Sequence, residues 1–110
     1  MTNLAQKKCV PCDGEVAPLT REETQPYLAE VKNWMLADDA KSISKKVNFP
    51  DFKSALDFVN QIGELAETND HHPNLKLGWG YVNITFSTHS IRGLSENDFI
   101  LAAKIDELRR

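Results

Sequence analysis

The three histidines of this chain all fall within residues 71–89. His71 and His72 follow a run of acidic residues, and His89 comes directly after an alternating stretch that is typical of a β-strand. An unperturbed histidine has a pKa of roughly 6.5, so its imidazole can give or accept a proton near neutral pH. Two imidazoles on opposite sides of a cleft could protonate a leaving group and remove a proton elsewhere. This pair of proton transfers describes an elimination or a dehydration.

Acidic residues accompany the histidines at the predicted end of a helix. Glu67 and His71 are four residues apart and share a face if the helix persists that far. Glu67 and Asp70 stand near the negative end of the helix dipole, where acids are unfavourable, and such departures tend to mark functional positions. Because Pro73 restricts His72 to an extended backbone, we expect the two neighbouring imidazoles to diverge.

Other interpretations of these residues remain open. His-His-Pro after a helix can be a solvated cap, His89 a polar strand end, and Asp98 a capping acid. Three histidines with a carboxylate could also ligate zinc, but adjacent histidines rarely point at one ion and no HExxH spacing is present, so we expect no metal site.

Cys9 and Cys12 could form a redox or metal pair. No helix start follows them to activate a thiol, and we expect them to lie in an exposed arm.

Length and composition describe an average globular chain. It has 110 residues, of which 41% are hydrophobic and 26% are charged, which is typical of one domain. No apolar run is long enough to cross a membrane, and the N-terminus lacks a secretory signal, so we expect a cytosolic protein without a membrane partner. A net charge of −3 with scattered basic residues argues against a nucleic-acid partner.

The helices that must position the histidines follow from periodicity and capping signals. Residues 1–18 show no periodicity and are predicted to form a flexible arm, followed by a domain at residues 19–110. A Thr20–Glu23 capping box predicts a first helix, although Pro26 indicates a later start or a kink.

The clearest helix is predicted at residues 50–69, with Pro50 in its first turn. Its apolar residues recur at helical spacing and predict one core-facing stripe. They are Phe52, Ala55, Leu56, Val59, Ile62 and Ala66.

Strands and a closing helix complete the pattern. Two hairpins are predicted, at residues 34–37 with 42–49 and at residues 75–77 with 81–88. Lys45 and Lys46 indicate an exposed edge or outer surface. By alternation His89 lies opposite the core side of its strand. Ser95 caps the last helix and places Asp98 at its third position. The order α-β-β-α-β-β-α predicts an α+β domain, with a four-stranded antiparallel sheet and helices packed on one face.

Three segments of this chain, taken together, resemble the pterin-4a-carbinolamine dehydratases. The resemblance extends from about residue 19 to the end, and its motifs fix three histidines, their spacing and the following helix cap at once. The segments are Glu67-x-x-x-His71-His72-Pro73, then Val82 through His89, then Gly93-Leu94-Ser95-x-x-Asp98.

The resemblance implies a cofactor-free hydro-lyase that converts a 4a-hydroxytetrahydropterin to quinonoid dihydropterin and water. It implies that His71 and His89 share the acid and base roles, in an order left open, while His72 mainly holds the pterin. Glu67 and Asp98 would orient the imidazoles, and the remaining substrate contacts would come from the pocket wall. Those contacts are Pro73, Thr88, Ser90 and Ile91.

The same resemblance implies a role beside aromatic amino acid hydroxylases, whose pterin cofactor the reaction would regenerate. It also implies a homodimer or a homotetramer. Some members of the family are dimerisation partners of a transcription factor. The alternative function is therefore a non-enzymatic interaction module with a vestigial pterin site.

Overall fold

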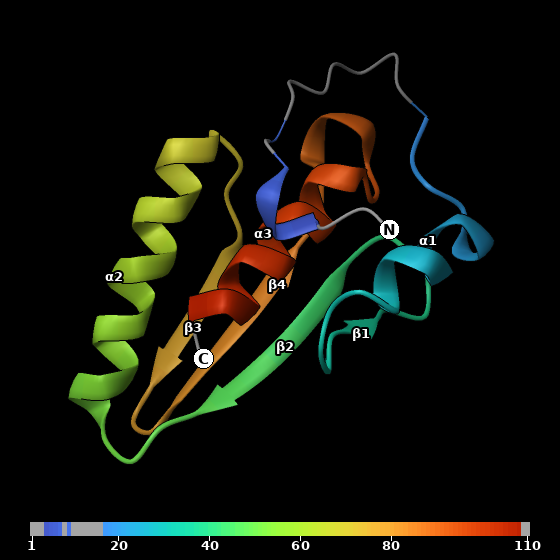
Figure 1. The fold of residues 1–110 in the computed structure, drawn as a ribbon. Coiled ribbons are helices and arrows are strands. Elements are labelled where there is room, and N and C mark those ends of the chain that lie inside the picture. Colours follow the sequence, from blue (N-terminus) through green and yellow to red (C-terminus); the bar gives the residue numbers. More distant parts are fainter. Residues whose placement is uncertain (1–3, 8, 10–16, 109–110) are drawn as a thin grey trace.

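The computed structural model describes residues 4–7, 9 and 17–108 and has the predicted order of helices and strands (Figure 1). The elements are η1 (Leu4–Gln6), α1 (Arg21–Leu28), β1 (Met35–Leu36), β2 (Ile43–Asn48), α2 (Phe52–Asn69), β3 (Asn74–Gly78), β4 (Tyr81–Phe86), η2 (His89–Ile91) and α3 (Glu96–Leu108). None of the helices in the described residues is long and apolar enough to cross a membrane.

The four strands form one antiparallel sheet in the order β1-β2-β4-β3. Both predicted hairpins are present, and the inner strands β2 and β4 join them. Val47 pairs with Val82, and Ile43 pairs with Phe86. All four side chains are buried beneath the helices, with α2 and α3 lying across one face of the sheet (Figure 1). This confirms the predicted α+β class with helices on one face.

The first turn of α2 differs from the prediction. Asp51 is the N-cap, and its carboxylate accepts a hydrogen bond from the Ser54 amide at 2.8 Å. Pro50 therefore precedes the cap, and its predicted place inside the first turn is wrong. The physical reason is that Asp51 is a strong capping residue and ends the extended segment one residue after the proline.

The core stripe of α2 is also shifted from the predicted one. The side chains that α2 buries are Ala55, Phe58, Ile62 and Ala66. Phe52 and Leu56 were predicted to face the core, but they are 43% and 38% exposed. Both lie on the flank of the helix, because the sheet is contacted by the row of residues spaced three or four apart from Ala55. Phe58 takes the place that the prediction gave to these two residues.

The start of α1 follows its capping box. Thr20 Oγ1 accepts from the Glu23 amide, and the Glu23 carboxylate accepts from the Thr20 amide. The helix begins at Arg21 and contains Pro26. The later start suggested by the proline is therefore wrong, since the reciprocal cap outweighs the one backbone donor that the proline lacks.

Lys45 does not mark an exposed edge. It lies in the inner strand β2, on the face covered by the helices, and its Nζ is 2.9 Å from a carboxylate oxygen of Asp106 in α3. Only 16% of its side chain is exposed. The prediction is wrong at this position because the carboxylate of Asp106, whose side chain is 13% exposed, stabilises the ammonium there. Lys46, which alternates to the other face, is exposed as predicted.

The described parts of the N-terminal segment pack against α3. Leu4 is 2% exposed and belongs to the core, the Ala5 carbonyl accepts from Lys104 Nζ at 2.7 Å, and Lys7 pairs with Glu96. Cys9 is half-buried, and its Sγ lies 3.8 Å from the Asn97 carbonyl oxygen. The half-buried position of Cys9 differs from the exposed one that the sequence predicts, because Leu4 anchors the neighbouring residues in the core. Cys12 lies outside the described residues.

Candidate active site

The end of α2 separates the two adjacent histidines. Asp70 has a left-handed backbone (φ 51°, ψ 42°), and the His71 amide bonds back to the Ala66 carbonyl at 3.2 Å. Because the helix ends at Asn69, the shared face expected for Glu67 and His71 does not form.

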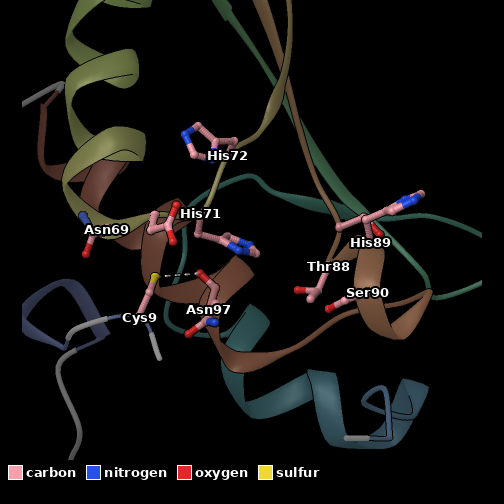
Figure 2. Close-up of a pocket in the computed structure, with 10 residues that line it drawn as sticks. Cys9, Asn69, His71, His72, Thr88, His89, Ser90 and Asn97 are labelled. Atoms are coloured by element: carbon pink, nitrogen blue, oxygen red, sulfur yellow. Dashed lines mark hydrogen bonds between the residues drawn. The ribbon is translucent and has the colours of Figure 1, made fainter. Parts of the chain in front are cut away.

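The two imidazoles take different partners and diverge, as the following proline predicts. His71 turns toward Asp98 in α3, and His72 pairs with Glu67 at the surface. Figure 2 shows the two rings pointing in different directions. The side chains of His72 and Glu67 are 51% and 78% exposed, so this second pair is largely in water.

His71 is the most firmly held of the three histidines. Its Nε2 is 2.7 Å from Asp98 Oδ1, and its ring stacks on Phe86 with 6.0 Å between centroids and 8° between planes. Asp98 has no exposed surface, and only 12% of the His71 side chain is exposed. A carboxylate accepts hydrogen bonds, so the pairing assigns a proton to Nε2 and leaves Nδ1 as the second ring nitrogen available for chemistry.

Asp98 accepts from two further donors besides His71. Thr88 Oγ1 and the Ser95 amide donate to its Oδ2 at 2.8 and 3.0 Å. The Ser95 amide bond is the capping interaction predicted for α3, because Asp98 occupies the third position of the helix. Among the described residues, no buried side-chain nitrogen or oxygen lacks a partner. The same carboxylate therefore caps a helix and holds an imidazole.

His89 lies where β4 has already ended. The strand stops at Phe86, and a bridge between Thr88 and Gly93 encloses the single 3-10 turn that begins with His89. The strand alternation used to orient His89 therefore does not reach it. His89 is exposed, and Figure 2 shows its ring pointing outward from this loop.

A cavity of about 470 Å³ opens between the end of α2, the loop after β4 and the first turn of α3. All three histidines line it. The full lining is Cys9, Asn69, Asp70, His71, His72, Ser87, Thr88, His89, Ser90 and Asn97. Its size lies within the range of roughly 300–1,000 Å³ that is typical of small-molecule sites.

Not every predicted contact residue reaches this cavity. Thr88 and Ser90 line it, whereas Glu67, Pro73, Ile91 and Asp98 do not. Asp98 is completely buried, and its two hydrogen-bonded neighbours in the cavity wall are His71 and Thr88. Ile91 is 6% exposed and packs inward.

Asp70, which the sequence analysis identified as an unusual acid at the end of a helix, lies in the cavity wall. Sequence reasoning missed four other residues of this wall. Three of them are next to identified residues in the sequence and could have been found for that reason: Asn69, Ser87 and Asn97. Cys9 is different, because it arrives from a segment 88 residues away from its partner Asn97. No local pattern predicts such a contact.

Within residues 4–7, 9 and 17–108, no group of three or more His, Cys, Asp or Glu side chains is placed to hold a metal ion. The chemistry that the described side chains offer is proton transfer by imidazole, with one ring oriented by a buried carboxylate.

The fold and the cavity together define a small α+β protein with a histidine-lined pocket of small-molecule size. A model of the family described as "Pterin 4 alpha carbinolamine dehydratase" matches residues 17–108, and the chain belongs to this family.

Two relatives show how much of the chain is shared. A protein of Methylococcus capsulatus is 48% identical over 106 residues, covering 96% of this chain and 93% of its own length. A protein of Rickettsia canadensis is 50% identical over 106 residues, covering 96% and 97%. Both carry the provisional name pterin-4-alpha-carbinolamine dehydratase.

Two solved structures are similar in fold. A transcriptional coactivator/pterin dehydratase from Brucella melitensis has a TM-score of 0.78 at 32% identity, over 83% of this chain and 97% of its own. A pterin dehydratase-like protein identified as a RuBisCO assembly factor in the alpha-carboxysome has a TM-score of 0.60 at 26% identity, over 69% and 88%.

Proposed function

We propose that this protein dehydrates a 4a-hydroxytetrahydropterin to quinonoid dihydropterin and water, by histidine acid–base catalysis without a cofactor. The observation that carries the proposal is the buried Asp98–His71 pair at the wall of a cavity of about 470 Å³, which His72 and His89 also line. Membership of the dehydratase family supports it. In the cell, the reaction would return the pterin used by an aromatic amino acid hydroxylase.

The reaction needs two proton transfers and no change of oxidation state. The bond between C4a and the hydroxyl oxygen breaks, and its electron pair leaves with the oxygen, which takes a proton to become water. The N5 proton is removed, and the electron pair of that N–H bond forms the N5–C4a double bond. One imidazolium and one neutral imidazole can therefore complete the reaction, because an unperturbed imidazole group gives or accepts a proton near neutral pH.

His71 is suited to one of these transfers by its partner. With Nε2–H donating to Asp98, a neutral His71 presents the Nδ1 lone pair as a base, and a protonated His71 presents Nδ1–H as an acid. The carboxylate holds the ring in place and stabilises the imidazolium, as in other catalytic Asp–His pairs.

His89 is proposed as the second acid–base group, and His72 with Glu67 as the pair that holds the pterin. His89 and His72 line the same cavity as His71. Both are more exposed than His71, which suits groups that exchange protons with water or meet a ligand at the rim.

The test is a dehydration assay with freshly generated 4a-hydroxytetrahydropterin, comparing wild type with His71→Ala and His89→Ala. We expect wild type to exceed the uncatalysed rate and each variant to lose a factor of about 100 or more. Lys46→Ala is the matched control, since it removes an exposed side chain on the opposite face of the sheet and should leave the rate unchanged. A wild-type rate equal to the uncatalysed rate would overturn the proposal.

The second candidate function is a non-enzymatic interaction module. It is favoured by the two solved relatives, whose reported roles include transcriptional coactivation and RuBisCO assembly. If the assay fails, affinity capture of protein partners becomes the next experiment. With the enzymatic function we also propose a cytosolic homodimer or homotetramer that binds no nucleic acid.

A further inference from the structure

A chain of two hydroxyl groups runs into the buried Asp98 carboxylate. Ser95 Oγ lies 2.7 Å from Thr88 Oγ1, and Thr88 Oγ1 donates to Asp98 Oδ2 at 2.8 Å. A threonine hydroxyl has one proton, and Thr88 uses it on Asp98. The proton between the two hydroxyls must therefore come from Ser95, so donation runs from Ser95 to Thr88 to Asp98.

We propose that Thr88 and Ser95 are positioning residues for proton transfer by His71. Their ordered donation satisfies Oδ2 of Asp98 and leaves Oδ1 for the His71 ring. The inference rests on the proposed function, in which His71 moves a proton. It assigns a role to Ser95, and it gives Thr88 a role different from the substrate contact that the family resemblance implies.

Burial and hydrogen bonds within the protein favour an indirect role for both residues, although Thr88 also forms part of the cavity wall. Thr88 is 4% exposed, and both its proton and an acceptor site of its hydroxyl are already used within the protein. Ser95 is 7% exposed and is not part of the cavity wall. We therefore infer that both hydroxyls act on turnover through Asp98.

The hydrogen-bond donors to Asp98 also reduce the negative charge that its carboxylate presents to the His71 ring. A carboxylate that accepts fewer hydrogen bonds keeps more of its negative charge, and that charge favours the protonated imidazole. Removal of the Thr88 hydroxyl should therefore raise the pH at which His71 loses its proton. The other titratable groups around this cavity stay unchanged in such a variant: Cys9, Asp70, His72, His89 and, through His72, Glu67.

The test compares Thr88→Val, which keeps the shape but removes the hydroxyl, with Thr88→Ser, which restores it. For Thr88→Val we expect kcat to fall about tenfold with KM unchanged, as loss of one hydrogen bond to a charged group would produce. Thr88→Ser should recover most of the rate. A rise in KM with kcat unchanged would overturn the proposal, because it would make Thr88 a substrate contact.

Two control variants separate positioning from general structural damage. Thr24→Val removes a buried hydroxyl that donates to the Arg21 carbonyl at 2.6 Å, away from the site. Thr20→Ala removes the equivalent cap of α1. Both controls should keep the wild-type kcat.

A double variant tests whether the Ser95 hydroxyl acts through the Thr88 hydroxyl. Ser95→Ala alone should lower kcat by a few-fold, and Thr88→Val with Ser95→Ala should be no slower than Thr88→Val, because Ser95 acts only through Thr88. Independent, multiplicative losses would contradict the chain.

The pH titration of the His71 ring signals, followed by nuclear magnetic resonance, tests the inference without measuring enzyme activity. The midpoint should lie at a higher pH in Thr88→Val than in wild type and return in Thr88→Ser. An unchanged midpoint would overturn the inference even if the enzyme is active. A shifted midpoint in a protein that dehydrates no pterin would overturn the proposed function and leave the hydroxyl chain supported.

Discussion

Two carboxylates of α3, Asp98 and Asp106, accept the same number of hydrogen bonds but from different kinds of donor. Each accepts hydrogen bonds from three donors in other segments or in the helix cap. For Asp98 the donors are His71 Nε2, Thr88 Oγ1 and the Ser95 amide. For Asp106 they are Trp34 Nε1, Lys45 Nζ and the Lys32 amide.

The difference lies in the charged donor and in the adjoining space. The charged donor to Asp106 is a lysine, a residue type that ordinarily keeps its proton throughout the neutral range. The Lys45–Asp106 pair joins β2 to α3. A histidine can exchange its proton in that range. The cavity beside His71 is about 470 Å³, whereas the one beside Asp106 is about 130 Å³. Of these two carboxylates, only Asp98 has a histidine as its partner and the larger cavity beside it, and only Asp98 belongs to the candidate site.

The largest loss of stability is expected when Asp106 is removed. Asp106→Ala leaves the Lys45 ammonium and two N–H donors without their acceptor, and we expect the free energy of unfolding to fall by about 3 kcal/mol. Urea unfolding measures this loss. The kcat of the folded variant should match wild type, and a large fall in kcat with stability intact would contradict the separation of the two networks.

Asp51 differs from both carboxylates of α3 because it is exposed to solvent. The hydrogen bond from the Ser54 backbone amide lowers the pKa of Asp51 below its usual value. A lowered folded-state pKa adds stability above the unfolded pKa, about 3.9 for Asp, and this stability is lost as the pH falls through the folded pKa.

Asp51→Asn keeps a good helix cap without a titrating group, so its unfolding free energy should fall less steeply with acid than that of wild type. Urea unfolding at a series of pH values between neutrality and pH 2 measures the two slopes. Equal slopes would show that this carboxylate adds no pH-dependent stability. The effect should be the smallest of those predicted.

Local patterns in the sequence were sufficient for most of the fold. The periodic spacing of Ala55, Ile62 and Ala66 predicted α2, and the Thr20–Glu23 pair predicted the start of α1. Patterns failed where long-range partners decide the outcome. Lys45 looks like an edge residue until Asp106, 61 residues later, is brought against it.

The candidate site was predictable to a similar degree. The histidines and Asp98 could be identified from their types and motif spacing, and the structure places all three histidines around one cavity. The pairing of Glu67 with His72 could not be predicted, because it depends on the left-handed turn at Asp70 that ends α2. Cys9 could not be placed, since the packing of Leu4 in the core brings its segment to α3.

The claim that Asp98 orients His71 for catalysis, whereas Asp106 only stabilises the fold, is tested most directly by two kcat values. They are those of Asp98→Asn and Asp106→Asn, each measured on folded protein at saturating 4a-hydroxytetrahydropterin. An asparagine at position 98 can donate to His71 Nε2, which favours the tautomer with its proton on Nδ1 and removes the base. We predict a loss of about 100-fold or more for Asp98→Asn and a change of less than about twofold for Asp106→Asn. Equal losses in the two variants, or a wild-type rate in Asp98→Asn, would contradict the account.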